Sequence, residues 1–135
     1  MDNAYVPDSY ALIAHFEDEP AGEQVRKLLR TARAGRAKLY LSVVNFGEIL
    51  YTTMRERGED KAEEVCLVID QMPLSIVDAD RDLTMEAARL KARHPVAYAD
   101  CFAAALAVMK RAKVVTGDPE FRKFKEAVKI DWLPD

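Results

Sequence analysis

Cysteine is scarce in this sequence, with only Cys66 and Cys101 among 135 residues. Both lie in apolar segments, and two such cysteines cannot build a disulfide scaffold, which excludes a small disulfide-rich secreted fold. No apolar run approaches the length that crosses a membrane, and the first residues lack the basic and apolar regions of a secretory signal. We therefore expect a cytoplasmic protein with no membrane partner.

An excess of positive charge is also missing. Lys and Arg number 20 against 23 Asp and Glu, which gives a formal net charge of −3 and a pI near 5.5. The overall field therefore lacks the basic signature of many nucleic-acid-binding domains, although local basic groups can still contact phosphates. Repeats, low-complexity tracts and linkers are not found either, so residues 1–135 are expected to form a single domain.

Strand-like and helix-like segments alternate along the chain. Short apolar runs predict strands at residues 4–7, 38–41, 74–77, 113–116 and 128–132. Helical periodicity and capping signals predict helices at residues 10–16, 21–34, 43–57, 60–72, 80–93, 96–109 and 120–127. Since parallel strands need long crossover connections, this alternation predicts an α/β fold of three α/β/α layers around a central parallel sheet.

Two of the predicted helical regions are almost wholly apolar, yet each contains a single acidic residue. Residues 96–109 contain Asp100, and residues 41–54 contain Glu48. The apolar helix is expected to lie wholly inside the protein, and no Lys or Arg lies one turn from Asp100, so this carboxylate needs a partner from elsewhere. The alternative is that Asp100 caps a helix beginning at Cys101, where backbone N–H groups would satisfy it.

Two further acids, Asp8 and Asp118, each follow the C-terminal end of a predicted strand. If the first and fourth strands are neighbours, these acids lie side by side at the edge where open parallel sheets bind ligands. Glu48 and Asp100 can lean over the same crevice from flanking helices. Each acid also has a simpler explanation, because Asp8 and Asp118 can cap helices and Glu48 can be a partly exposed helix residue. Their joint placement favours a shared acidic site.

Carboxylates that converge in this way repel one another and must bind protons or cations. Mg²⁺ prefers oxygen ligands and retains several of its waters. One or two metal ions would lower the pKa of a bound water and neutralise charge on a scissile phosphate, which predicts metal-dependent phosphodiester hydrolysis. Ser9, Asn45 and Thr116 lie beside these acids and could orient a carboxylate or a metal-bound water, or could make only local structural hydrogen bonds.

At these positions the sequence resembles the PIN-domain nucleases, and in size it is similar to the VapC-like toxins of toxin–antitoxin pairs. The matching segments are VPDSYALIAHFEDEP, SVVNFGEILYTTMR, VAYADCFAAALA and VVTGDPEFRKF, which together span nearly the whole chain. The resemblance implies a sheet of strand order 3-2-1-4-5, Mg²⁺ or Mn²⁺ at the acidic cluster, and hydrolysis of RNA. It also implies a homodimer and inhibition by a co-transcribed antitoxin.

Carried over residue by residue, the resemblance assigns roles to the four acids. Asp8 and Asp100 would be the principal metal ligands. Glu48 would be a ligand or would hold the metal-bound water, and Asp118 would be a ligand through water or of a second metal.

Two residues depart from the family pattern. Pro7 stands where an aliphatic residue is usual, which removes one strand donor, and Tyr10 stands where a small residue is usual. Both changes affect the expected shape of the pocket and leave every carboxylate in place.

The leading hypothesis is therefore a metal-dependent endoribonuclease, and three alternatives remain open. Another Mg²⁺-dependent phosphodiesterase or a DNA nuclease would use the same acids, and a catalytically silent binding module would keep only the fold. A receiver-like phosphoacceptor domain would need an acceptor after the third strand, where Asp78 and Asp80 stand. RNA would be held by basic groups near the acids, for which the candidates are Lys91, Arg93, Arg122, Lys123 and Lys125.

Overall fold

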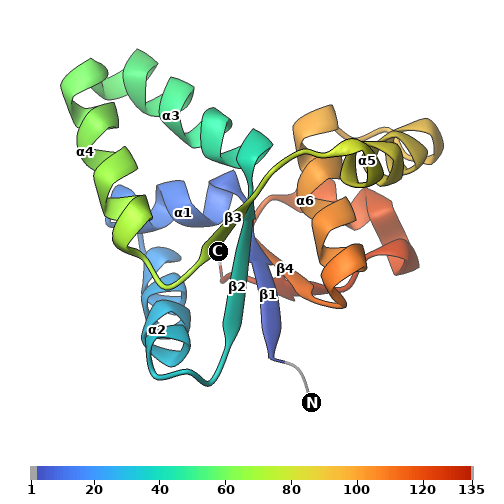
Figure 1. Ribbon diagram of the computed structural model, residues 1–135, viewed down its shortest axis with the longest axis horizontal. Coiled ribbons are helices and arrows are strands. Elements are labelled where there is room, and N and C mark those ends of the chain that lie inside the picture. The colour runs from blue at the N-terminus through green and yellow to red at the C-terminus, as the bar shows by residue number, and fades with distance from the viewer. Residues whose placement is uncertain (1–2, 135) are drawn as a thin grey trace.

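Residues 3–134 are described by the computed structural model, which confirms the predicted alternation of strands and helices (Figure 1). The strands are β1 (Ala4–Pro7), β2 (Lys38–Ser42), β3 (Ser75–Val77), β4 (Lys113–Thr116) and β5 (Ile130–Trp132). The helices are α1 (Ser9–Phe16), α2 (Gly22–Arg33), α3 (Val43–Arg57), α4 (Glu59–Gln71), α5 (Arg81–Arg93), α6 (Tyr98–Lys110) and the 3-10 helix η1 (Pro119–Ala127). Among the described helices, none is both long and apolar enough to cross a membrane.

The strands form one parallel sheet in the order β3-β2-β1-β4-β5, which confirms the predicted fold class and strand order. β1 lies in the centre, where Tyr5 is opposite Leu39 of β2 and Pro7 is opposite Val115 of β4. The Asp8 backbone N–H donates to the Val115 carbonyl oxygen at 3.2 Å, so the pairing extends to the first acid despite the proline before it. Because the strand order reverses between β1 and β4, this edge is the point at which such sheets bind ligands.

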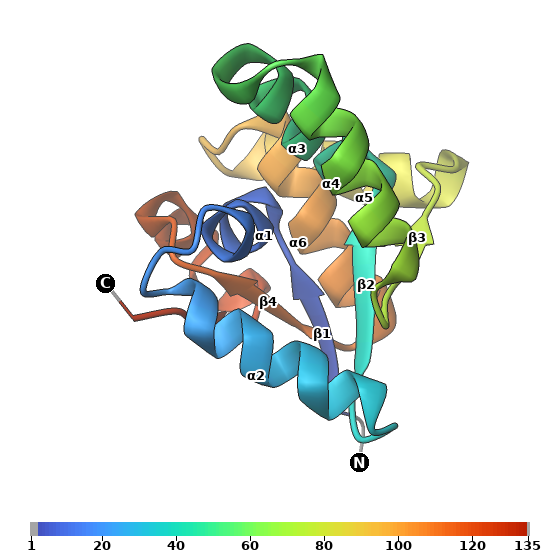
Figure 2. The ribbon, with the colours of Figure 1, turned by 90° about the vertical axis from the view of Figure 1, so that its left-hand side faces the viewer.

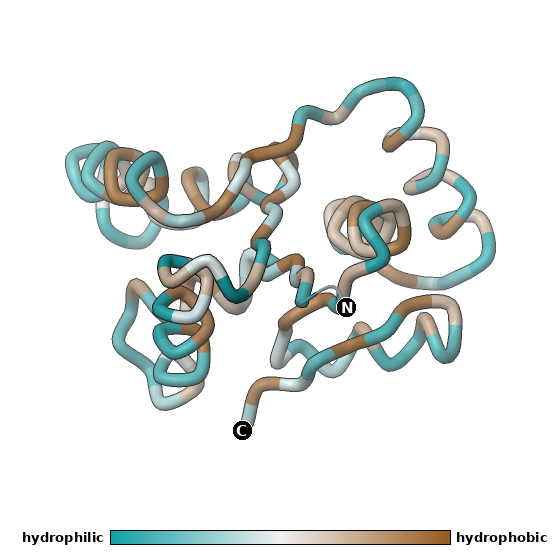
Figure 3. Tube along the Cα trace, turned by 60° about the horizontal axis from the view of Figure 1, so that its bottom comes forward, coloured by the Kyte–Doolittle hydropathy of each residue, from teal (hydrophilic) through white to brown (hydrophobic). Residues whose placement is uncertain are grey.

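Helices cover both faces of the sheet, and each face has its own hydrophobic cluster. One cluster joins β1 and β4 to α5, α6 and η1 and includes Leu106 and Phe121. The other joins the sheet to the α1–α4 side and includes Leu12 and Ile49. In Figures 1 and 2 the α5–α6 pair and the α1–α2 pair lie on opposite sides of the strands. Figure 3 shows hydrophobic residues concentrated along the strands and hydrophilic residues along the outer turns of the helices.

The structure corrects one prediction for the apolar helix, excludes one alternative, and defines the kind of helix that follows Asp118. The apolar helix is not wholly buried, because Val108 and Met109 near its C-terminal end are exposed. It begins at Tyr98 with Ala97 at its N-cap, so the alternative in which Asp100 caps a helix is excluded. The helix after Asp118 is a 3-10 helix interrupted at Lys125, whose φ of 54° is left-handed. The small side chains of α6 nevertheless bury its middle, and its first turn holds Asp100 close enough to Asp118 and Glu48 for their charges to affect its pKa.

Two glycines in helices provide a matched test of the packing between α1 and α2. A Cβ at Gly22 would lie 2.7 Å from the Ala14 carbonyl oxygen and 2.9 Å from the His15 Cα, both of which are backbone atoms that cannot move aside alone. We expect Gly22→Ala to lower the free energy of unfolding by about 1–3 kcal/mol, because the two helices must separate. A Cβ at Gly47 meets nothing within 4 Å, so Gly47→Ala in α3 should be stabilising. Urea unfolding of both variants measures the contrast, and equal effects would contradict it.

Candidate active site

Asp8 is held at the end of β1 by hydrogen bonds to both of its carboxylate oxygens. Oδ1 accepts from the Ala11 backbone N–H at 2.9 Å and thereby caps α1, while Oδ2 accepts from the Thr116 hydroxyl at 2.6 Å. The residue is only 1% exposed. Burial raises the pKa of the Asp8 carboxyl to about 7; the hydrogen bonds from Thr116 and Ala11 lower it, and the charges of Asp100 and Asp118 raise it. Its capping role therefore coexists with an acid-rich environment.

Asp100 lies in the first turn of α6 and faces the other acids. Burial again raises its pKa to about 7, and repulsion from Asp118, Glu48 and Glu120 adds to this effect. The helix N-terminus partly offsets the repulsion, because backbone N–H groups there favour negative charge. Asp100 is thus electrostatically coupled to acids from three other elements of the fold.

Glu48 and Asn45 of α3 together connect the starts of α1 and α6 through side-chain hydrogen bonds. The Ser9 hydroxyl donates to Glu48 Oε1 at 2.6 Å. Asn45 Nδ2 donates to the same oxygen at 3.4 Å and to the Ala99 carbonyl oxygen at 3.1 Å. Asn45 is fully buried, and its Oδ1 finds no hydrogen-bond partner among residues 3–134. The Glu48 carboxylate is therefore held at Oε1, and Asn45 links it to Ala99, the residue before Asp100.

Asp118 lies in the turn after β4 and is linked to Asp8 through one hydroxyl. Its backbone N–H donates to Thr116 Oγ1 at 3.0 Å, and the same hydroxyl donates to Asp8. One carboxylate oxygen of Asp118 accepts from the Glu120 backbone N–H at 2.9 Å and caps η1. Capping thus occupies one carboxylate oxygen of Asp118 and leaves the other free of the cap.

The structure brings the four acids to one edge of the sheet without a basic counter-charge. Within residues 3–134, no salt bridge involves any of them. Burial is the main cause of the raised pKa values of Asp8 and Asp100, and repulsion from the neighbouring acids raises both further. In the same part of the chain no three His, Cys, Asp or Glu side chains are arranged to hold a metal ion directly. The donor chemistry still fits a hard divalent cation, because such cations take carboxylate oxygens and complete their shells with water.

Substitution of Thr116 tests how its hydroxyl controls the pKa of Asp8. We expect Thr116→Val to raise the pKa of Asp8 further, since the substitution removes the hydrogen bond that favours the carboxylate. Any activity that needs ionised Asp8 should fall by about 10- to 100-fold at neutral pH and recover partly at higher pH. Thr116→Ser keeps the hydroxyl and should leave the pH profile near that of the native protein. A pH profile unchanged in Thr116→Val would contradict this role.

The basic residues predicted to contact phosphates differ in whether their charged groups are already paired. Lys91 Nζ donates to the Val96 carbonyl oxygen at 2.8 Å, and Lys123 pairs with Glu120 at 2.9 Å, so both are engaged locally. Arg122 instead lies over the ring of Trp132, with 5.1 Å between its Cζ and the ring centroid. Trp132 was not singled out from the sequence; its position at the end of the last strand was the only signal.

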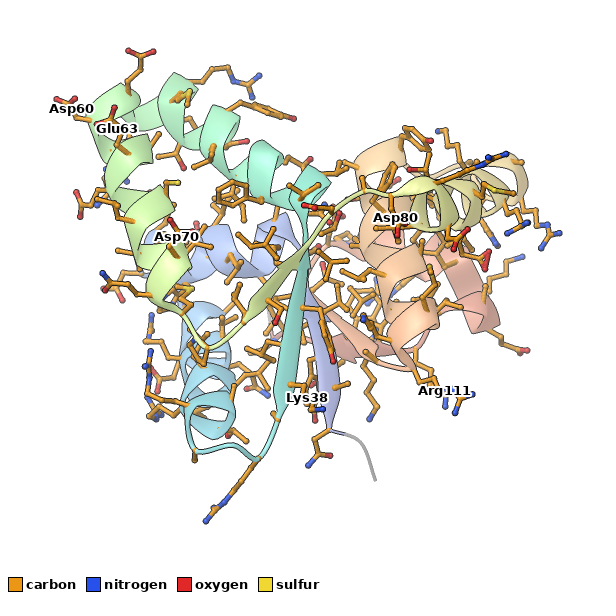
Figure 4. All side chains as sticks on the ribbon, viewed as in Figure 1. Lys38, Asp60, Glu63, Asp70, Asp80 and Arg111 are labelled. Carbon is orange, nitrogen blue, oxygen red and sulfur yellow. The ribbon has the colours of Figure 1, made fainter. Side chains whose placement is uncertain are left out.

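Asp78 and Asp80, the residues on which the phosphoacceptor alternative depends, lie outside this site. Asp80 is the N-cap of α5, where its Oδ1 accepts from the Leu83 backbone N–H at 2.9 Å. Figure 4 shows Asp80 at the start of that helix. Asp78 is exposed in the loop after β3 and is not among the charges that perturb Asp8 or Asp100. These contacts give Asp80 a structural role.

Comparisons with known proteins agree with this architecture. The family model of the PIN domain matches residues 5–127. No curated protein sequence matches the chain. Three solved structures have similar folds. A chain of VapBC2 from Rickettsia felis, bound to a promoter DNA fragment, is 15% identical with a TM-score of 0.75, and the match covers 97% of this chain and 99% of that one. DNA-bound VapBC from Salmonella typhimurium gives 16% identity, a TM-score of 0.75 and 98% coverage of both chains. VapC20 from Mycobacterium tuberculosis, a toxin that cleaves the sarcin-ricin loop, gives 16% identity, a TM-score of 0.72 and coverage of 97% and 99%.

Proposed function

Because the chain belongs to the PIN-domain family, we propose that it is a metal-dependent endoribonuclease that acts as the toxin of a toxin–antitoxin pair. The observation that carries this proposal is that four acids lie close together, without salt bridges among residues 3–134, at the edge of the sheet where the strand order reverses between β1 and β4. The similar fold of VapC20, a toxin that cleaves the sarcin-ricin loop, supports RNA as the substrate.

The acids divide into metal ligands and a residue that handles the attacking water. Asp8 and Asp100 would hold Mg²⁺ or Mn²⁺ directly, and Asp118 would bind it through water or hold a second ion. Mg²⁺ is commonly bound by one or two carboxylates and several waters, so a cage of three direct protein ligands is not required. When bound, the cation would acidify a water and neutralise charge on the phosphodiester in the transition state.

The remaining contacts prepare these side chains for the reaction. Thr116 favours the ionised form of Asp8 by donating to Oδ2, which opposes the effect of burial on the pKa of this ligand. Ser9 and Asn45 both donate to Glu48 Oε1, which leaves Oε2 to accept a hydrogen bond from the attacking water. A water oriented in this way can be activated without a Ser, Cys or His nucleophile.

The proposal includes two protein partners. Similar folds occur in VapBC complexes, which supports an antitoxin that binds this chain. We also propose a homodimer, and exposed apolar side chains on the helices provide surface for such contacts: Tyr51, Met54, Leu67, Val68, Met85 and Met109. Size-exclusion chromatography with light scattering of the purified chain tests the homodimer, and co-expression with the neighbouring reading frame tests the antitoxin.

The function is tested by incubating the purified protein with structured and single-stranded RNAs, and with DNA of the same sequences. We expect cleavage of RNA with Mg²⁺ or Mn²⁺ and no cleavage with EDTA, because the acids need a divalent cation to act on a phosphate. Cleavage of DNA alone would favour the DNA nuclease alternative. Absence of cleavage under every condition, with RNA still bound, would favour a silent binding module.

A further inference from the structure

A hollow of about 370 Å³ opens directly beside the acidic site. Gly117 and Pro119, the two neighbours of Asp118 in the chain, form part of its wall. The rest of the wall is made by Arg122, Trp132, Leu133 and Pro134. Pockets that hold small ligands begin at about 300 Å³, so the hollow has room for a group of nucleoside size.

Trp132 gives this hollow a flat aromatic surface. In the sheet it is opposite Thr116, which places it at the same edge as Asp8 and Asp118. Trp132 is 38% exposed, and it is the only tryptophan of the chain. The next residue, Leu133, is buried, and its backbone N–H donates to the Thr116 carbonyl oxygen at 2.9 Å. The strand end that carries the indole is therefore firmly attached beside the acids.

Arg122 adds a cation to the same hollow. Its neighbours on η1, Phe121 and Phe124, are fully buried, so the helix is anchored while Arg122 faces outward. With the described residues Arg122 forms no salt bridge and no side-chain hydrogen bond; its contact is the stack over the Trp132 ring. A stacked guanidinium keeps the N–H groups in its plane available to an anion such as phosphate.

A second exposed aromatic side chain borders the same turn. A Cβ at Gly117 would lie 2.5 Å from Tyr10 Cε1, so the Tyr10 ring rests on the backbone of the turn that carries Asp118. The Tyr10 side chain is 42% exposed. The glycine thus accommodates the bulky residue that departs from the family pattern. Tyr10 and Trp132 both flank the turn that presents Asp118.

We propose that the hollow binds the base of an unpaired RNA nucleotide next to the scissile phosphate, with the base stacked on Trp132 or on the guanidinium of Arg122. This inference rests on the proposed ribonuclease function. Bases of single-stranded RNA stack on aromatic rings and on Arg planes, whereas a paired base in a duplex cannot leave its stack without unpairing. The hollow and Asp118 share one turn, so a base held there keeps its own phosphate close to the acids. The chain therefore selects unpaired nucleotides at the cleavage site.

Fluorescence of the single tryptophan tests the contact without any cleavage. In EDTA, a single-stranded RNA of about ten nucleotides should quench Trp132 emission in a saturable manner. An abasic ribose-phosphate strand of equal length carries the same charge without bases and should leave the emission unchanged, and an RNA duplex should quench weakly. Equal quenching by the abasic strand, or no quenching by the single strand, would overturn the proposal.

Variants separate binding from catalysis. Trp132→Ala and Arg122→Ala should each raise the KM for single-stranded RNA by about 5- to 100-fold, with kcat changed less than about twofold. Trp132→Phe keeps an aromatic ring and should retain most of the affinity, which controls for misfolding of the alanine variant. Lys110→Ala is the matched control, because Lys110 also lies over an aromatic ring, 4.8 Å from the Tyr40 centroid. Lys110 is the last residue of α6, so it lies at the opposite end of that helix from Asp100. Figure 4 shows the next residue, Arg111, toward the side of the molecule where Lys38 begins β2.

The two levels of inference fail in different ways. If no nucleic acid is cleaved with any cation, the proposed function fails, and the EDTA binding experiment still decides whether bases enter the hollow. If Trp132→Ala and Arg122→Ala cleave RNA with unchanged KM, the base-binding hollow is overturned and the ribonuclease stands.

Discussion

Replacing Asp8 or Asp100 by Asn should reduce cation-dependent RNA cleavage by about 1000-fold or more, which corresponds to about 4 kcal/mol of lost transition-state stabilisation. An amide has no negative charge with which to hold a divalent cation, and both residues are proposed as direct ligands. The measurement is kcat/KM for a fluorogenic RNA in Mg²⁺ and in Mn²⁺. Both variants should keep the fold. Neither acid forms a salt bridge with residues 3–134, and Asn at position 8 can still accept from the Ala11 N–H and can donate to the Thr116 hydroxyl.

Asp78→Asn is the matched control for these variants. It makes the same chemical change on an exposed acid near a strand end, and it should leave kcat/KM within about twofold, as expected for a surface substitution away from the site. Loss of RNA cleavage in Asp78→Asn with full activity in Asp8→Asn would move the reaction centre from the four acids to the end of β3. Full activity in both Asp8→Asn and Asp100→Asn would remove the proposed reaction centre.

In the absence of divalent cations, the free energy of unfolding should fall as the pH rises from about 5 to about 8. The folded protein holds the pKa of the Asp8 carboxyl at about 7, above its ordinary value of 3.8. Between these values the unfolded chain has already released the proton that the folded chain retains, so rising pH favours unfolding. For Asp8 alone the loss across this range is about 2–3 kcal/mol, or about 5–10 °C in Tm. Asp100, whose pKa is also raised, adds to the same slope.

The Asp8→Asn variant isolates this effect from other titrations. Burial lowers the pKa of His15 below the ordinary value of 6.5. As the pH falls below that value, the unfolded chain binds a proton more readily than the folded chain, so the free energy of unfolding falls with falling pH, opposite to the effect of Asp8. Subtracting the Asp8→Asn curve from the native curve cancels the His15 contribution, and Asp78→Asn should reproduce the native slope. Mg²⁺ should raise Tm more at pH 8 than at pH 5, because ionised carboxylates bind it better. If the native Tm minus the Asp8→Asn Tm, both measured without divalent cations, is constant or rises with pH, the raised pKa of Asp8 is contradicted.

The order of the elements could be predicted because each local pattern in the chain agrees with one fold. Short apolar strands alternate with helices of clear periodicity, and only a parallel sheet with crossover helices accommodates that order. The resemblance to PIN domains added the strand order, which the sheet confirms. The boundaries near Asp118 were less predictable, since a left-handed residue such as Lys125 depends on packing and has no signal in the local sequence.

The sequence by itself singled out the candidate acids: Glu48 and Asp100 because an isolated acid in an apolar helix is costly wherever the helix lies, and Asp8 and Asp118 because each follows a strand. It left open whether Asp8, Glu48, Asp100 and Asp118 meet, and it could not distinguish a capping Asp118 from one that faces the others. Only the tertiary structure decided these points, because the contacts join residues far apart in the chain, as Thr116 joins Asp8. The same holds for the hollow at Arg122 and Trp132. The sequence marks Arg122 only as one of several basic candidates and does not mark Trp132, and the two side chains meet only when η1 and β5 are packed side by side.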